Sequence, residues 1–491
     1  MFLFDDNTDN TAKISQIIAK NGFSDKEFLE REIAAWKISE TRRMQIKGRL
    51  YYDNQHDILF RKREAIGENG ELTEITNLPN NRVIDNVYGK LVNQKANYLL
   101  GQPFALDGEN KQYIDLLKTV FDKKFMRTLK NAGKASLNGG ISWLYPFYDD
   151  NGKFSFRMFP AEEILPFWRD SEHTVLDCAV RLYCVSVYEG SQQKIIEKVE
   201  VYSLDGVKKF ILDGGVLKPD ADENGSFVSS AVSVPDGQGG AIGYNWAKIP
   251  LIPIKYNESE TPLLKRVKTL QDGLNVMMSD FENNMQEDAR NTILVLKNFD
   301  GENLGEFRRN LATYGAVKVR CDGETNGGVD KLEVQVNSDN YKAIIYLLKK
   351  SIIENGMGYD AKDERLSGNP NQMNIQSMYS DIDLDANDME TELQAAFDDI
   401  LWFVNAHLAN SGYGDFSGET VNIIFNRDIL INETEAIQNC AASVGLLSGE
   451  TIVSQHPWVD DPQAELKRIQ AEKEAEAQAY DPFGGVNDEE Q

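Results

Sequence analysis

Apolar residues recur among charged ones in the first part of the chain, at the spacing of helices that pack on one face. Residues 26–52 and 80–103 show this pattern, and we expect the first of these helices to lie on the surface. The second ends at Gly101 and Pro103, residue types that commonly terminate a helix. A third helix is predicted over residues 110–137, before a pair of glycines.

Strand-like segments follow these helices. Residues 141–150, 153–160 and 177–190 are rich in β-branched and aromatic side chains, which are typical of strands. Residues 213–245 are rich in Gly, Ser and Asp and favour a flexible excursion over a nucleotide-binding loop. Residues 249–257 predict one more strand.

Two predicted helices bracket a small insertion in the middle of the chain. Residues 261–289 and 340–358 each carry an apolar stripe with alternating three- and four-residue steps. Residues 290–339 between them predict a compact α/β insertion. The stripes fit either the core of one subunit or contacts between subunits. Their members are Leu263, Val267, Leu270, Leu274, Phe281, Ile345, Leu348 and Ile352.

The C-terminal part begins with an aperiodic segment, Asp360–Gln372, which predicts a loop. A long helix is predicted at 373–408, with one apolar face and one face of carboxylates. Residues 430–478 predict shorter helices, and residues 479–491 read as disordered. We therefore predict an α+β, mainly helical fold.

The charge of the chain is unevenly distributed. Its net charge is −26, which argues against phosphate binding by the chain as a whole. Residues 1–260 hold 33 basic and 37 acidic side chains, residues 261–372 hold 15 and 17, and residues 373–491 hold 4 and 24. The acidity therefore belongs to the last quarter, and the middle segment is close to balanced.

No catalytic or metal-binding motif stands out. The chain has no GxxxxGK[ST] or HExxH motif, and its four cysteines form no CxxC pair. The carboxylate pairs Asp398-Asp399 and Asp460-Asp461 lie in acid-rich segments and favour a solvated helix face over two-metal chemistry. No apolar run reaches the ~18 residues that a membrane span needs. We expect no enzyme activity, no cofactor, no metal and no membrane partner.

Several sequence segments, taken in their order along the chain, resemble the portal family of long-tailed phages that infect Gram-positive bacteria. They are YYDNQHDIL, NNRVIDNVYGKLVNQKANYLLGQP, LLKRVKTLQDGLNVMMSDFENN, LSGNPNQMN and VGLLSGETIVSQHPWVDDPQAELKRIQAE. The resemblance covers nearly the whole chain and implies a ring of roughly twelve subunits, or thirteen in isolation. It implies these parts: wing 1–260, stem helices 261–289 and 340–358, clip 290–339, tunnel loop 359–372, long helix returning to the wing 373–429, and crown 430–478.

The resemblance also implies where DNA and other proteins would bind. The tunnel loop would turn Lys362, Arg365, Asn369, Asn371 and Gln372 toward double-stranded DNA, which passes without sequence specificity. The implied protein partners are the terminase ATPase, a head-tail adaptor, and the major capsid and scaffolding proteins. The implied location is the portal vertex of the virion, after assembly in the host cytoplasm. Two rival hypotheses are a carboxylate-dependent phosphoesterase and an oligomeric scaffold without a channel.

Overall fold

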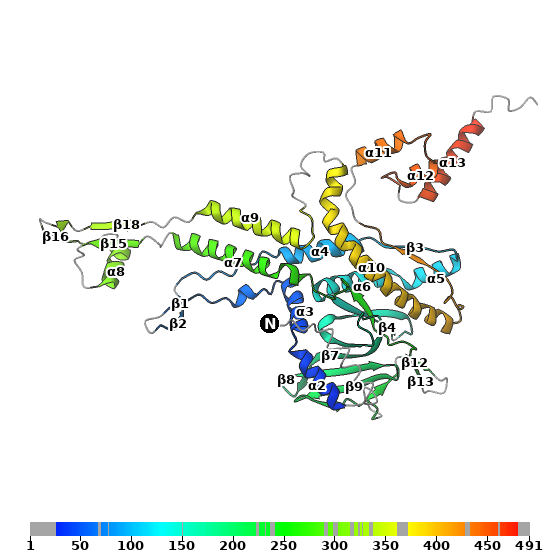
Figure 1. The fold of residues 1–491 in the computed structure, drawn as a ribbon, viewed down its shortest axis with the longest axis horizontal. Coiled ribbons are helices and arrows are strands. Elements are labelled where there is room, and N and C mark those ends of the chain that lie inside the picture. Colours follow the sequence, from blue (N-terminus) through cyan, green and yellow to red (C-terminus); the bar gives the residue numbers. More distant parts are fainter. Residues whose placement is uncertain are drawn as a thin grey trace, which may run out of the picture.

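The computed structural model shows a body of helices and sheets from which two long helices project together (Figure 1). A small unit lies at the far end of these helices, and a group of C-terminal helices lies beside the body (Figure 1). The structure describes residues 26–66, 70–76, 78–149, 151–221, 225–230, 232–235, 241–288, 293–297, 303–314, 319–322, 325–326, 328–332, 337–360, 372–427, 433–459 and 462–479. Helices and sheets both occur along the chain, so the α+β class is confirmed.

The described helices fall close to the periodic stretches of the sequence. They are α2 (Lys26–Lys37), α3 (Glu40–Tyr52), α4 (Val87–Leu100), α5 (Lys111–Val120), α6 (Lys123–Gly139), α7 (Leu264–Asp288), α8 (Leu304–Tyr314), α9 (Ser338–Asn355), α10 (Gln372–Asn410), α11 (Glu433–Ala442), α12 (Gly449–Ser454) and α13 (Pro462–Ala479), with 3₁₀ turns η1 (Asp57–Phe60) and η2 (Ala161–Glu163). The predicted long helices α7, α9 and α10 are confirmed. None of the described helices is both long and apolar enough to cross a bilayer.

Two predicted helices are each split by a capping residue. Residues 26–52 form α2 and α3, because the Ser39 side chain accepts a backbone N–H from the first turn of α3. Residues 110–137 form α5 and α6, because Asp122 accepts two N–H groups from the first turn of α6. The prediction of one continuous helix is wrong in both places.

The strands form several antiparallel sheets. Their bounds are β1 (Glu64–Ile66), β2 (Leu72–Glu74), β3 (Ala105–Asp107), β4 (Ile141–Tyr148), β5 (Phe154–Pro160), β6 (Ile164–Trp168), β7 (Leu176–Glu189), β8 (Gln192–Ser203), β9 (Gly206–Asp213), β10 (Val216–Pro219), β11 (Val228–Ser229), β12 (Val232–Pro235), β13 (Ala241–Tyr244), β14 (Ile252–Lys255), β15 (Ile293–Lys297), β16 (Cys321–Asp322), β17 (Thr325–Asn326), β18 (Gly328–Leu332) and β19 (Asn422–Ile424). The largest sheet has the order β10-β9-β8-β7-β6, with β11 paired to β9, and a second sheet has the order β14-β4-β5.

The segment 213–245 is more ordered than its composition suggests. Its described residues form β10 to β13, and β12 pairs with β13 in a hairpin. Gly214 and Gly215 have φ values of 60° and 84°, so they build the tight turn between β9 and β10 rather than a linker. The prediction of a flexible excursion is wrong for these residues.

The projecting pair consists of α7 and α9, which lie side by side (Figure 1). The unit at its tip contains β15 paired with β18, the helix α8, and the short pair β16–β17. The chain thus leaves the body along α7, forms the tip, and returns along α9. The predicted α/β insertion between two helices is confirmed for its described residues.

The largest core of the body joins α4, α5, α6, α10 and β19. Its centre is a group of phenylalanine rings with centroids about 5–6 Å apart, in edge-to-face or tilted contact. They are Phe104, Phe121, Phe125, Phe397 and Phe425. Residues from opposite ends of the sequence meet here, so α10 is an integral part of the body.

Candidate functional site

A row of polar side chains is buried along one side of α7. Gln271, Asn275, Ser279 and Asn283 are spaced four residues apart, so they share one face of the helix, and all four are buried. We call this row the polar ladder. Its members need partners, because a buried polar group left without a hydrogen bond costs about 1–3 kcal/mol.

The partners of the polar ladder are backbone N–H groups of residues 81–88. Asn81 donates to Asn283 Oδ1 at 2.7 Å, Val83 to Ser279 Oγ at 2.9 Å, Asp85 to Asn275 Oδ1 at 3.1 Å and Tyr88 to Gln271 Oε1 at 3.0 Å. Four residues of helix rise about 6 Å and two residues of extended chain about 6.6 Å. The first two steps, from Asn81 to Val83 and from Val83 to Asp85, therefore match the helix, and the last step to Tyr88 spans three residues at the start of α4.

The polar ladder also explains where α4 begins. The sequence predicts a helix from about residue 80, but α4 starts at Val87. The N–H groups before this point bond to α7 side chains instead of forming a helix, and Asn86 caps α4 by accepting the Gly89 N–H at 2.7 Å. The prediction is confirmed from Val87 onward and wrong before it.

His56 contacts the polar ladder at Asn275. Its fully buried ring stacks on Tyr51, with 4.3 Å between the centroids. Nε2 donates to the Tyr51 carbonyl at 3.0 Å, so Nδ1 accepts from the Asn275 amide at 2.8 Å. Burial lowers the pKa of His56, because the charged ring would lose its hydration. The site therefore holds a neutral imidazole.

Acidification is expected to weaken this packing. Since the pKa of His56 is lower in the folded chain than the unfolded value of about 6.5, the unfolded chain binds the proton first. Stability is therefore lost as the pH falls below about 6.5, by at most about 1.4 kcal/mol per pH unit for this one group. We expect urea unfolding between about pH 7.5 and 5.5 to show a shallower pH dependence for His56→Gln than for the wild type. Equal slopes would contradict the prediction.

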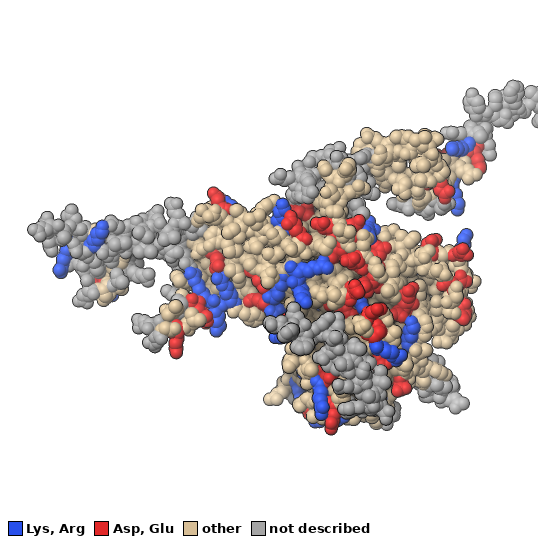
Figure 2. All heavy atoms as spheres, viewed as in Figure 1, with Lys and Arg blue, Asp and Glu red and all other residues tan. Residues whose placement is uncertain are grey.

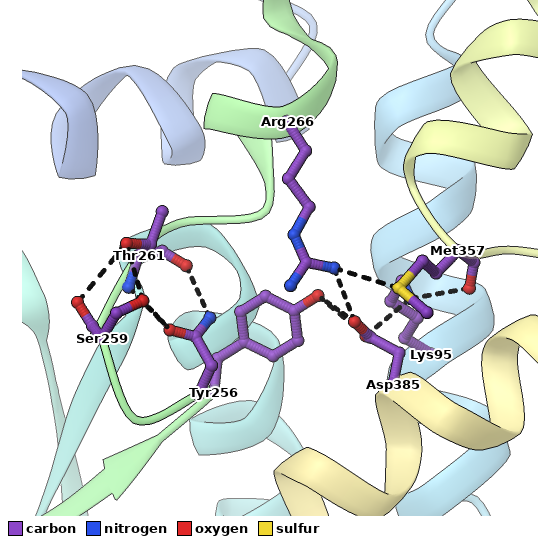
Figure 3. Close-up of polar contacts among 8 residues, drawn as sticks. Lys95, Tyr256, Ser259, Thr261, Arg266, Met357 and Asp385 are labelled. Carbon is purple, nitrogen blue, oxygen red and sulfur yellow. Dashed lines mark hydrogen bonds and ion pairs between the residues drawn. The ribbon is translucent and has the colours of Figure 1, made fainter.

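A second cluster of buried polar residues connects the body ends of the projecting helices α7 and α9 to α10 (Figure 3). Lys95 Nζ on α4 donates to Asp385 Oδ2 on α10 at 2.6 Å, and also to the Met357 carbonyl beyond α9 at 2.8 Å. Arg266 Nη1 on α7 donates to Asp385 Oδ1 at 2.7 Å. The Tyr256 hydroxyl, just after β14, donates to the same carboxylate at 2.8 Å. We call these five residues the Asp385 node.

Charge stabilises the Asp385 node in a buried setting. The side chains of Lys95 and Asp385 are each 4% exposed, whereas that of Arg266 is 34% exposed. Burial lowers the pKa of Lys95, and burial together with the Asp385 charge raises the pKa of Tyr256 well above its ordinary value. Met357 has a φ of 50°, a region seldom adopted by residues with side chains, and its carbonyl is fixed by Lys95. The node thus connects α4, α7 and α10 to the segments that follow α9 and β14.

The apolar stripes of the two projecting helices lie in the core of a single chain. Leu263, Val267, Leu274 and Ile352 are fully buried, while Leu270, Ile345 and Leu348 pack against the same core and are partly exposed. Near the tip, the Phe281 ring lies 5.1 Å from that of Tyr341, centroid to centroid. These residues therefore join α7 to α9 within one subunit.

The predicted DNA-facing loop falls mostly outside the described residues. Lys362, Arg365, Asn369 and Asn371 belong to residues 361–371, which the structure does not describe. Gln372 is the first residue of α10. Their role in DNA contact stays a prediction.

Several carboxylates of α10 are paired within the chain. Asp383 and Glu390 pair with Arg427, and Asp399 pairs with Lys248 at 2.7 Å. Asp385 belongs to the node. Of the pair Asp398-Asp399, which was predicted to lie on a solvated helix face, Asp399 is partly exposed and pairs with Lys248, a basic side chain from a distant segment. Asp398 is exposed, and Asp460-Asp461 lies outside the described residues.

The sequence segments that form the polar ladder and the Asp385 node also occur within a match to a known protein family. A family profile described as "Phage portal protein, SPP1 Gp6-like" matches residues 36–479, which include every element of both polar sites. The chain belongs to this portal family. Portal proteins are structural components of phages, so the expectation that the chain is not an enzyme is confirmed.

Individual portal proteins match along almost their whole length. The portal protein of Bacillus phage SPP1 is 30% identical over 451 residues, which cover 90% of this chain and 87% of that protein. The portal protein of Clostridium phage phiCD119 is 26% identical over 464 residues, which cover 91% and 97%. A chain from the virion of a native gene transfer agent particle covers 74% of this chain and 88% of its own length at 10% identity, with a TM-score of 0.37. That score is too low to bear on the fold.

The polar ladder and the Asp385 node of this portal chain were not predicted. The ladder carried a signal in the four-residue spacing of its Gln, Asn and Ser residues, beside the predicted apolar stripe. Asp385 carried none, because it is one of many acids in its segment. Nowhere among the described residues do three or more His, Cys, Asp or Glu side chains gather to hold a metal ion.

Proposed function

We propose that this portal protein assembles into a ring at one capsid vertex, with a central channel for DNA packaging and ejection. The observation that supports it best is the projecting pair α7 and α9 with its tip unit, combined with family membership over residues 36–479. In this proposal the pair is the stem, residues 290–339 are the clip, and residues 430–478 are the crown. The wing comprises residues 1–260, to which residues 373–429 return.

The channel would hold DNA weakly. Tight contacts between basic side chains and phosphates would have to be broken at every step of translocation, because each contact displaces counterions. Residues 261–372 hold 15 basic and 17 acidic side chains, which suits sliding better than binding. The loop 359–372 would narrow the channel and bring Lys362 and Arg365 near the duplex.

The acidic C-terminal quarter would line the inner end of the ring. Exposed Glu450, Glu472 and Glu474 belong to this segment and would keep packed DNA off the wall by like-charge repulsion. Several acids of α10 are unsuited to this role, because they are paired within the chain.

The clip would serve the protein partners in succession. An outward-facing tip unit would first bind the terminase ATPase and later a head-tail adaptor, while the wing would contact the major capsid and scaffolding proteins. Assembly would take place in the host cytoplasm. The tip is suited to this role because it stands farthest from the body (Figure 1).

Electron microscopy of the purified full chain tests the proposal. We expect rings of roughly twelve subunits with an open axial channel, since head-to-tail contacts close into rings. Filaments, or rings without a channel, would contradict it and favour a scaffold. Mg²⁺-dependent phosphoesterase activity of the isolated subunit would favour the enzyme hypothesis instead.

A further inference from the structure

Helix α6 presents a row of basic side chains along one side. Lys123, Arg127, Lys130 and Lys134 follow one another at steps of four, three and four residues, so they share one side of the helix. Lys123 and Arg127 are exposed, and the other two are half-buried. Within the described part of the chain, the first three form no ion pair. We call this row the basic stripe.

Helix α10 presents the opposite charge on its exposed side. One row of exposed positions repeats every three or four residues: Met373, Ser377, Asp381, Leu384, Asp388, Thr391, Ala395 and Asp398. The three aspartates in this row form no ion pair with any residue that the structure describes. Acidic side chains gather over the middle of the face drawn in Figure 2, where Figure 1 shows α10. We call this row the acidic stripe.

The two stripes lie on two helices that meet in the core. The buried sides of α6 and α10 meet each other, since a Cβ on Gly133 would lie 3.3 Å from the Met389 methyl group and the rings of Phe125 and Phe397 are 6.4 Å apart. Both stripes lie on the flanks of these helices, outside this contact, and Lys123, Arg127 and the three aspartates are exposed. The contact between α6 and α10 therefore leaves the basic and acidic stripes as two separate surfaces.

We propose that the acidic stripe of one subunit docks on the basic stripe of the next subunit. The inference rests on the ring proposed above and names the surfaces that form it. Two different, complementary patches on one molecule make a head-to-tail contact, which closes into a ring when the rotation fits. A two-fold dimer through either stripe would bring like charges together, so the head-to-tail arrangement is favoured.

A pocket beside the basic stripe is suited to Leu384, an exposed apolar member of the acidic stripe. This pocket has a volume of about 240 Å³, and Arg127 and Lys130 are among its lining residues. Leu384 is 58% exposed and stands one turn from both Asp381 and Asp388. A leucine between two carboxylates matches an apolar pocket beside two cations. The apolar lining of the pocket comes from Leu100, Pro103, Phe104, Met126, Leu129 and Phe425.

Charge reversal tests the proposal, because only the correct pair of surfaces can be exchanged. We expect Asp381→Lys/Asp388→Lys and Arg127→Glu/Lys130→Glu each to reduce ring formation at least about tenfold. An equimolar mixture of the two variants should recover rings with an even number of subunits, since the variants can then alternate so that opposite charges meet at every contact. Light scattering after size-exclusion chromatography and negative-stain microscopy measure both effects. The matched control Glu109→Lys/Lys111→Glu reverses two exposed charges outside the stripes and should leave rings intact.

A cross-link gives a second test that does not depend on charge. Oxidation of the double variant Leu384→Cys/Lys130→Cys should link neighbouring subunits into a ladder of multimers on denaturing gels, whereas either single variant should not. If the charge-reversed chains fail to fold, the cross-link alone shows whether the acidic and basic stripes of neighbouring subunits are in contact. Wild-type-like rings from both charge variants, or intact rings without the ladder, would overturn the inference and leave the ring itself standing. Absence of rings in the wild type would overturn both proposals.

Discussion

Replacing Asp385 with asparagine is expected to lower the free energy of unfolding by about 3–5 kcal/mol, because removing one partner of a buried ion pair leaves the other charge uncompensated. Lys95 would then be a buried cation facing a neutral amide, with Arg266 also deprived of its carboxylate partner. Denaturant unfolding followed by tryptophan fluorescence measures the change. A loss below about 1 kcal/mol would mean that the node is solvated.

Two further variants separate charge from packing at the Asp385 node. Asp115→Asn removes a carboxylate from an exposed ion pair with Lys118, so it should cost at most about 1 kcal/mol. Lys95→Met combined with Asp385→Leu removes the pair and should recover part of the loss, because no charge is left buried without a partner on either residue. Failure of this double variant to exceed Asp385→Asn in stability would show that the uncompensated charge of Lys95 is not the source of the effect.

The second large effect is expected in the polar ladder. Gln271→Leu/Asn275→Leu keeps the side chains similar in size but leaves the N–H groups of Tyr88 and Asp85 without acceptors. At about 1–3 kcal/mol for each orphaned group, the free energy of unfolding should fall by about 2–6 kcal/mol. Exposed Gln286 on the same helix supplies the control, and Gln286→Leu should change stability by no more than about 0.5 kcal/mol. Equal effects of the two changes would rule out the ladder as a source of stability.

The long helices could be predicted because their apolar stripes persist over many turns. The helix α10 was expected at 373–408 and runs from Gln372 to Asn410. The breaks at Ser39 and Asp122 were missed because a capping side chain in the middle of an amphipathic pattern looks like another polar surface position. Whether it caps or points to solvent depends on the packing of the neighbouring helices.

The candidate sites were harder to predict because both depend on partners far away in the sequence. The polar face of α7 reads as a solvent face until residues 81–88 pack against it. Asp385 differs from its acidic neighbours only in facing Lys95, some three hundred residues earlier. Periodicity shows which side of a helix is apolar, but not which distant segment covers its polar side.

The polar ladder has a mechanical consequence. Its four N–H bonds cross from α7 to residues 81–88, spaced along the helix, so a force along α7 loads them together in shear rather than one after another. A slip of less than one step, about 6 Å, would leave all four donors without acceptors at the same time. These bonds thereby hold α7 against sliding along its axis, so a force on the helix is passed directly to the body.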